Sequence, residues 1–378
     1  MIARYTVCML SDSPKVERFR CPGCSADMEY DPESGGMKCR FCGHAETLSP
    51  AQTAEVRAHA LQDALTQTAG GRAKPLSEQA LEVHCDSCVS AVVFEPPEVA
   101  GACAFCGAAI VAEPKAADPL ISPDAVLPAK IPKNTAQEEV RQWLASRWFA
   151  PNALKRMAQE EGIGGVYLPF WTYAADTESD YTGQRGEHYW ETEYYTETDS
   201  EGKTVERSRQ VQHTRWYPAS GHVVRRFDNV LIAATRAVKE SRLNGLAPWD
   251  LEALRPYEPA YLAGFRAQRY QVELPEGYEK AKEVMAAAIE EDVRQDIGGD
   301  EQSVDRIETS HANVMFRHLL LPVWIGAYRF QGKVYQVAVN ARTGEVQGER
   351  PYSPWKITLL VACVLLLVCL IVLLAQRR

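Results

Sequence analysis

The pattern of apolar and polar positions changes along the chain from a period of two to helical spacing and back. Alternation with a period of two predicts β-strands at residues 165–175, 181–195, 205–216, 221–234, 319–330 and 333–340. Apolar residues spaced by three and four predict helices at 51–69, 135–148, 152–161 and 277–296. A hairpin turn is expected at 199–202, between two of the strands. The pattern predicts an α+β domain over residues 135–355, built on an antiparallel sheet.

Two short segments of this domain resemble each other. Leu168-Pro-Phe-Trp171 and Leu321-Pro-Val-Trp324 both begin predicted strands. The repetition indicates that the two strands are paired or duplicated elements of the sheet.

The C-terminal end has a different pattern. Residues 357–375 are 19 consecutive residues without a charge, long enough as a helix to cross a hydrocarbon layer of about 30 Å. Tyr352 and Trp355 precede the run, and Arg377 and Arg378 follow it, as is typical of the ends of a membrane span. A buried core helix is the alternative. We expect a transmembrane helix at 356–376 in a tail-anchored protein of the inner membrane, with its N-terminal domains in the cytoplasm.

Eight of the eleven cysteines form two copies of one motif. In each copy, two Cys-x2-Cys pairs are separated by 14 residues, and the copies are offset by 64 residues. The eight cysteines are Cys21, Cys24, Cys39 and Cys42 in the first copy and Cys85, Cys88, Cys103 and Cys106 in the second. Tyr30 matches Phe94 and Phe41 matches Phe105 at the same offset, which indicates an internal duplication.

The spacing predicts two structural zinc sites. Each Cys-x2-Cys turn presents two sulfurs, and two such turns complete a tetrahedral shell of four thiolates, which suits Zn²⁺. Iron in a rubredoxin-like site is a competing interpretation, as are a disulfide framework and a thioredoxin-like redox site. Both shells are complete, so neither metal is expected to hold a substrate.

The cysteine copies and the composition between them divide the chain. We expect a first zinc ribbon at 1–48, a helical linker at 49–80 and a second ribbon at 81–112. Five prolines between residues 114 and 132 predict a stiff linker at 113–134. The predicted fold class is α+β, with two small four-cysteine zinc ribbons, a larger antiparallel-sheet domain and one C-terminal transmembrane helix.

The charge distribution bears on the partner of the ribbons. The net charge is −9, and residues 1–118 contain 10 basic and 16 acidic residues. Arg18, Arg20, Lys38 and Arg40 surround the first ribbon and are compatible with phosphate contact. The second ribbon has no Lys or Arg between His84 and Gly107, so it would repel nucleic acid. This balance favours a protein partner over a nucleic acid.

The sequence shows no clear catalytic motif. Gly202-Lys203-Thr204 resembles the end of a P-loop, but position 197 is Glu where a Walker A motif requires Gly. His188, His213 and His222 lie on the predicted sheet, near Glu187 and Asp228 in the sequence. A metal or acid–base cluster of these residues is one interpretation, and exposed strand histidines are the other.

The chain also resembles a known family. The paired ribbons, the segments VYLPFWTYAADTESDYTGQRG, HTRWYPASGHVVRRFDNVL and LLLPVWIGAYRFQGKVYQVAVNARTGEVQGERPYS, and the terminal apolar run resemble a bacterial family of tail-anchored double zinc-ribbon membrane proteins. Members are often labelled as the primosomal protein N′ or replication restart helicase, a label that the absence of a Walker A motif contradicts. The resemblance implies association with SPFH (flotillin/stomatin-like) or phage-shock-type membrane proteins.

These observations lead to one principal hypothesis and two alternatives. The principal hypothesis is a non-enzymatic, membrane-anchored cytoplasmic adaptor whose ribbons dock or recruit a protein partner. The alternatives are a membrane-tethered protein associated with nucleic acid, and an enzyme with an unrecognised site in the 165–340 sheet.

Overall fold

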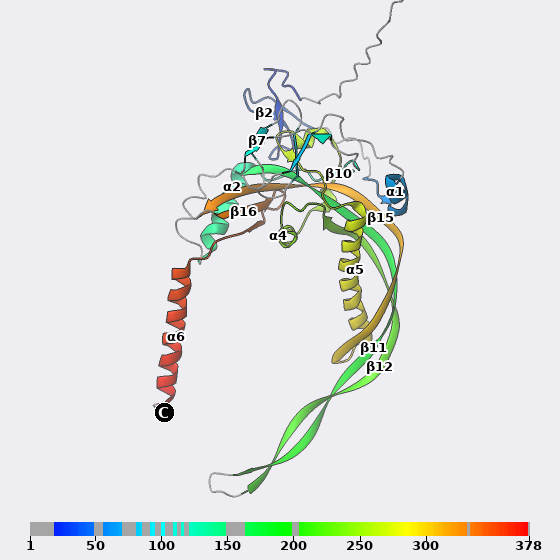
Figure 1. Cartoon of the computed structure of the whole chain (residues 1–378), viewed down its shortest axis with the longest axis vertical. Coiled ribbons are helices and arrows are strands. Elements are labelled where there is room, and N and C mark those ends of the chain that lie inside the picture. The colour runs from blue at the N-terminus through cyan, green and yellow to red at the C-terminus, as the bar shows by residue number, and fades with distance from the viewer. Residues whose placement is uncertain are drawn as a thin grey trace, which may run out of the picture.

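A large, strongly curved sheet forms the body of the protein in the computed structural model (Figure 1). The structure describes residues 19–48, 56–69, 121–148, 163–198, 204–330 and 333–376, and five short strands between 81 and 116. Within these residues, the strands run in the order β12-β11-β15-β10-β13. Three of the strands are very long: β11 (Gly164–Thr198), β12 (Thr204–Ala233) and β15 (Glu301–Phe330).

The long strands pair antiparallel, as the sequence predicts. β11 lies between β12 and β15, and the two Leu-Pro segments pair directly, with Leu168 opposite Leu321. The prediction that these segments are paired is therefore confirmed. Shorter strands extend the sheet: β4 (His59–Ala60), β10 (Ala125–Val126), β13 (Arg255–Pro256), β14 (Arg266–Ala267), β16 (Lys333–Asn340) and β17 (Val346–Gly348).

Two β-bulges lie side by side where the sheet bends. Ala174 stands opposite two residues of β12, Asp228 and Asn229, and Ala175 stands opposite two residues of β15 that include Asn313. Asn229 and Asn313 have φ angles of 59° and 51°, a conformation that Asn tolerates better than most residues. Because a bulge bends its strand and increases the local twist, this pair accounts for part of the curvature.

Helix α5 (Leu274–Ile297) packs against the concave side of the curved sheet (Figure 1). Trp171 Nε1 donates to the Val272 carbonyl and Tyr173 Oη donates to the Leu274 carbonyl, both at 2.8 Å, and these bonds fix the start of the helix. The buried residues of α5 recur mostly at a spacing of four: Leu274, Gly277, Ala281, Met285, Ile289, Val293 and Ile297. Four residues turn a helix by about 400°, so the stripe moves about 40° around the helix at each step and follows the twisted sheet.

The proline-rich segment enters the body. β10 pairs in parallel with β15, and Leu127 N–H donates to the Leu320 carbonyl at 2.9 Å. Ala125, Val126 and Leu127 are completely buried. Ala125 and Val126, which the sequence assigns to a linker, are thus part of the sheet.

The other described helices before residue 300 are short and lie around the sheet. Their bounds are α1 (Leu61–Ala69), α2 (Lys133–Ser146), α4 (Glu240–Gly245), η1 (Leu251–Ala253) and η2 (Pro259–Leu262). α2 buries Ala136, Val140 and Leu144 against the body, close to the helix predicted at 135–148. The helix predicted at 152–161 lies outside the described residues.

The C-terminal apolar run forms helix α6 (Pro354–Gln376), whose apolar side chains are exposed. In the part of the chain that the structure describes, however, no helix has both the length and the apolarity that crossing a membrane requires. This finding contradicts the predicted transmembrane helix at 356–376 and the predicted single-pass location in the inner membrane. The predicted fold class is therefore wrong in its transmembrane helix, whereas the structure does contain the large antiparallel sheet.

Candidate metal centre

The four cysteines of the first ribbon converge on one point. Their Sγ atoms all lie within 4.8 Å of one another. The Cys21 and Cys42 sulfurs are 3.3 Å apart, and those of Cys24 and Cys39 are 3.4 Å apart. The cluster can hold a metal ion, as the cysteine spacing predicts.

Two similar turns bring the sulfurs together. In the first turn, Ser25 N–H donates to the Cys21 carbonyl at 2.8 Å, and in the second, Gly43 N–H donates to the Cys39 carbonyl at 3.1 Å. Ser25 and Gly43 occupy equivalent positions, with φ angles of 59° and 75°. This conformation explains the glycine in the second turn, whereas the first turn holds a serine in the same strained region.

The strands of the ribbon hold these turns in place. β1 (Met28–Asp31) pairs antiparallel with β2 (Gly36–Cys39), and β2 pairs with β3 (Ala45–Glu46). Cys39 ends β2, and the second turn connects β2 to β3. Cys21 and Cys39 are buried, while Cys24 and Cys42 are exposed.

The electrostatics of the cluster favour a bound cation. Backbone N–H groups of Cys42 and Phe41 donate toward Cys39 and lower the pKa of its thiol to about 6. The backbone N–H of Ala26 lowers the pKa of Cys24, but hydrogen bonds with the Cys39 and Cys42 thiols outweigh it and raise that pKa to about 12. Four thiolates this close repel one another, so full ionisation requires a positive charge among them.

The ribbon is seated firmly on the sheet domain. Tyr30 is buried, its Oη donates to the Ala129 carbonyl at 3.2 Å, and its ring meets Tyr261 edge-on at 5.6 Å. Tyr30 N–H donates to the Ala263 carbonyl at 2.9 Å. Met28 and Met37 belong to the same buried cluster as Tyr167 and Trp324 of the sheet. The metal centre is therefore held in a fixed place relative to the body.

The opposite end of the ribbon faces solvent. Phe41 lies between Cys39 and Cys42 in the second turn, and its side chain is 81% exposed. Two basic residues near it are paired within the ribbon: Arg40 with Glu29 at 2.5 Å and Lys38 with Asp31 at 3.8 Å. The sequence indicates Phe41 only through its match with Phe105, and its exposure is not evident from the pattern.

The four cysteines of the second ribbon, Cys85, Cys88, Cys103 and Cys106, lie outside the described residues. The strands that flank them are described. β5 (Leu81–His84) pairs antiparallel with β6 (Ala91–Phe94), and β7 (Ala100–Ala102) pairs antiparallel with β8 (Ala109–Val111). β9 (Lys115–Ala116) pairs with β5. Each Cys-x2-Cys pair therefore falls between two paired strands.

The structure does not bring the three sheet histidines together. His188 Nε2 lies 2.7 Å from Glu301 Oε1, and His222 Nδ1 lies 2.9 Å from Asp180 Oδ1. His213 stacks on Tyr189, on the strand face opposite to His188. His213 and His222 are nine residues apart on β12, which corresponds to about 30 Å at the usual rise of a strand. These histidines occupy three separate, partly exposed places.

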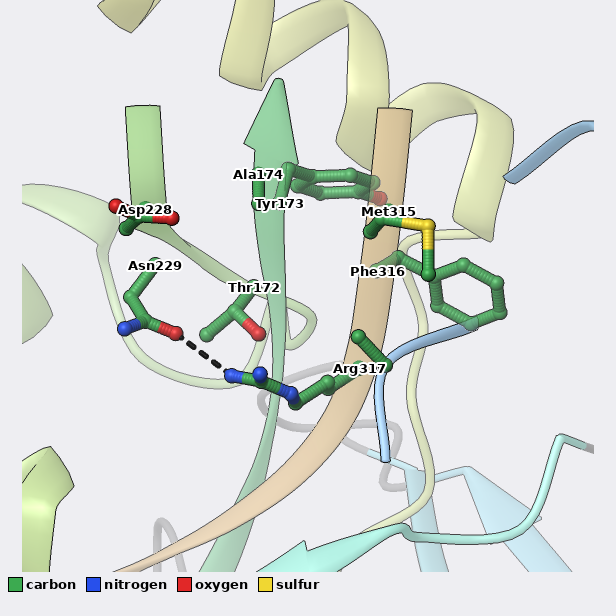
Figure 2. Close-up of a pocket in the computed structure, with 9 residues that line it drawn as sticks. Thr172, Tyr173, Ala174, Asp228, Asn229, Met315, Phe316 and Arg317 are labelled. Atoms are coloured by element: carbon green, nitrogen blue, oxygen red, sulfur yellow. Dashed lines mark hydrogen bonds between the residues drawn. The ribbon is translucent and has the colours of Figure 1, made fainter. Parts of the chain in front are cut away.

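A cavity of about 310 Å³ lies beside the paired bulges (Figure 2). Thr172, Asp228 and Arg317 contribute polar groups to it, and Arg317 Nη1 donates to Asn229 Oδ1 at 2.9 Å. Ala58, Met315 and Phe316 are among its apolar lining. None of the three sheet histidines lines this cavity. The sequence does not indicate it, because its residues come from four separate segments.

Comparison with known proteins gives one distant relative. The chain is 25% identical over 341 residues to the "Uncharacterized protein YdjG" of Bacillus subtilis (strain 168), covering 90% of this chain and 91% of that protein. The similarity therefore extends over nearly the whole length of both chains. No family model matches the chain, and no solved structure matches it.

Proposed function

We propose that this protein is a non-enzymatic zinc-ribbon adaptor that docks a protein partner. The two ribbons each hold one structural Zn²⁺, through Cys21, Cys24, Cys39 and Cys42 in the first and Cys85, Cys88, Cys103 and Cys106 in the second. Zinc fits this donor set because four thiolates in a closed shell suit a borderline-soft ion with tetrahedral preference. A closed shell leaves no position for a substrate.

The exposed Phe41 carries the docking part of the proposal. The turn that contains Phe41 is anchored by the metal ligands Cys39 and Cys42, which lie on either side of it in the sequence. The ribbon itself is fixed to the body through Tyr30. A large apolar side chain on a rigid support loses little conformational entropy on binding, which favours it as an interface anchor. The resemblance to the double-ribbon family makes an SPFH- or phage-shock-type oligomer the first partner to test.

A nucleic-acid partner is the less favoured alternative. Lys38 and Arg40, two of the basic residues that would contact phosphate, are paired with Asp31 and Glu29. Phosphate binding would have to break these pairs. Such binding would be strongly weakened by salt, unlike the docking of an apolar side chain.

Docking is tested by affinity capture of partners with the full-length chain and a Phe41→Ser variant. We expect Phe41→Ser to lower partner recovery about tenfold or more, since a buried aromatic anchor contributes more than about 1.4 kcal/mol. Val224→Ser, which alters another exposed apolar residue on β12, is the matched control and should leave recovery unchanged.

Three outcomes would limit or contradict the proposal. Equal recovery with Phe41→Ser would exclude the first ribbon as the docking element. Recovery that survives both Cys85→Ser and Cys103→Ser would limit docking to the first ribbon. Metal analysis of the purified chain should give about two zinc ions, and one or none would refute the assignment of two zinc sites.

A further inference from the structure

The ends of β11 and β12 form a two-stranded arm that extends beyond the body (Figure 1). We define the arm as residues 187–198 of β11 and 204–215 of β12, which pair from Glu187↔Arg215 to Thr198↔Thr204. β15 begins at Glu301, opposite Gly186, so it does not reach the arm. Twelve residue pairs at the usual strand rise give the arm a length of about 40 Å.

One side of the arm, the ionic face, is formed by the odd-numbered residues. The β11 strand contributes four glutamates to it, and the β12 strand contributes three arginines and a histidine. These charged residues are Glu187, Glu191, Glu193 and Glu197, and Arg207, Arg209, His213 and Arg215.

The ionic face is occupied by contacts within the arm. Arg209 donates to Glu193 at 2.8 Å, and Arg207 lies 2.9 Å from Glu197. The two tyrosines of this face are covered by cations: Arg215 lies 4.7 Å from the ring centre of Tyr189, and Arg209 lies 5.7 Å from that of Tyr195.

The other side, the aromatic face, is formed by the even-numbered residues. Trp190 and Tyr194 are 62% and 71% exposed there. Their neighbours are almost all neutral and polar: Thr192, Thr196, Thr198, Thr204, Ser208, Gln210, Gln212 and Thr214. His188 pairs with Glu301 at the base of the arm, and Glu206 is the other ionisable residue of this face.

This division of the two faces is unexpected for an arm that serves only as a solvated loop. A two-stranded ribbon without a core is marginally stable in water, so twelve pairs gain stability if one face is covered. Interfaces are depleted in charge and enriched in Trp and Tyr, which describes the aromatic face and not the ionic face.

We propose that the aromatic face pairs with the aromatic face of a second copy of this chain. A nearly neutral face can meet its own copy without repulsion between like charges, as a two-fold contact requires. A two-fold axis parallel to the arms sets each β11 strand over the partner's β12 strand, so the acidic rows of the two arms are not superposed. The ionic faces remain in solvent.

The size of the arm sets the strength of this contact. A strip about 40 Å long and 10 Å wide covers about 400 Å² on each copy, less than the roughly 800 Å² per partner of a standard interface. The dimer is therefore reversible, and its population depends on protein concentration.

Sedimentation velocity over a concentration series of the full-length chain tests the proposal. The double substitution Trp190→Ser and Tyr194→Ser should raise the dimer dissociation constant at least tenfold. Tyr195→Ser, on the ionic face of the same strand, should leave it within about twofold, because that side chain stays in solvent. Replacing residues 187–215 by an Asn-Gly turn should abolish the same association.

Cross-linking locates the contact independently of affinity. A short bifunctional thiol reagent should link two copies of Thr192→Cys, on the aromatic face, above the level seen with the wild-type chain, and it should not do so for Val211→Cys on the ionic face. A wild-type chain that stays monomeric, an association that survives removal of the arm, or equal cross-linking at both positions would overturn the proposal.

Discussion

His318 is buried in the sheet between aromatic rings. Trp171 and Tyr270 pack against its imidazole at centroid distances of 4.7 and 5.5 Å, and its Nδ1 lies 2.9 Å from the Ile121 carbonyl oxygen. Burial lowers the pKa of His318 to about 4, so the folded protein holds this ring neutral at pH 7. A neutral ring lets the histidine pack as part of the aromatic core.

This burial predicts a loss of stability in mild acid. The unfolded chain binds a proton at His318 near pH 6.5, whereas the folded chain binds it only near pH 4. Between these values the unfolded state holds more protons, so the free energy of unfolding falls as the pH falls, by up to about 3 kcal/mol in total. Urea denaturation of the wild type and of His318→Phe between pH 7 and pH 4 measures the difference.

The variant should show a shallower dependence on pH, whatever its stability at pH 7. Phe316→Leu is a suitable control, since it alters a buried neighbour that does not titrate. It should lower stability equally at all pH values. Parallel pH profiles for His318→Phe and the wild type would show that His318 does not carry the effect.

At the scale of elements, α5 lies close against the sheet at Gly277. A Cβ atom at this position would lie 2.5 Å from Tyr173 Oη and 2.8 Å from Trp171 Cδ1. The same two side chains hold the start of the helix through their hydrogen bonds to the Val272 and Leu274 carbonyls. Any side chain at position 277 must displace one of these contacts.

We therefore expect Gly277→Ala to destabilise the protein by about 1–3 kcal/mol, although Ala is the better helix former by about 1 kcal/mol. Thermal unfolding followed by circular dichroism measures the change. Glu283→Ala, an exposed position on the same helix, should alter stability by less than about 0.5 kcal/mol. A Gly277→Ala variant as stable as the wild type would show that the helix can shift without cost.

The sequence predicts the elements that keep a regular period. The helix expected at 277–296 is α5, and the strands expected at 319–330 and 333–340 lie in β15 and β16. The first 18 residues of β15 are not predicted, because register shifts near Val304 and Asn313 break the alternation of polar and apolar positions. The sequence pattern does not predict β10, because prolines surround it. The strand is recognised only from its pairing with Leu319 and Leu320 of β15.

At the scale of the whole molecule, the first ribbon is attached to the sheet through Tyr30. The substitution Tyr30→Ala removes the ring that packs on Tyr261 and leaves all four cysteine ligands unchanged. We expect a loss of about 3–5 kcal/mol in stability and faster hydrogen exchange in residues 124–131, with the metal content unchanged. Phe41→Ala, at the exposed end of the ribbon, should leave both quantities unchanged. Unaltered exchange in Tyr30→Ala would mean that other contacts suffice to hold the ribbon.

The candidate site is predictable only in part. Spacing alone identifies Cys21, Cys24, Cys39 and Cys42, because two Cys-x2-Cys turns meet at short range. It does not reveal that Tyr30 faces the sheet or that Phe41 faces solvent, since both depend on contacts with distant segments. The two faces of the arm are equally hard to predict from the sequence. They depend on the pairing register of β11 and β12, and a slip of one residue would move the side chains of a strand to the opposite face.

The position of β10 fixes an order of events during synthesis. The metal ligands of the first ribbon are at most 21 residues apart, so the ribbon can close as soon as Cys42 is available. The backbone N–H of Leu127 cannot form its hydrogen bond until Leu320 has been made, and that of Lys130 cannot do so until Ala341 has been made. Until Tyr261 and Ala263 have been made, about seven-tenths of the way along the chain, a finished ribbon with Met28, Tyr30 and Met37 on its surface has no body to rest on. The nascent chain therefore exposes an apolar patch that the mature protein conceals, at the stage when a chaperone or the docking partner itself can bind it.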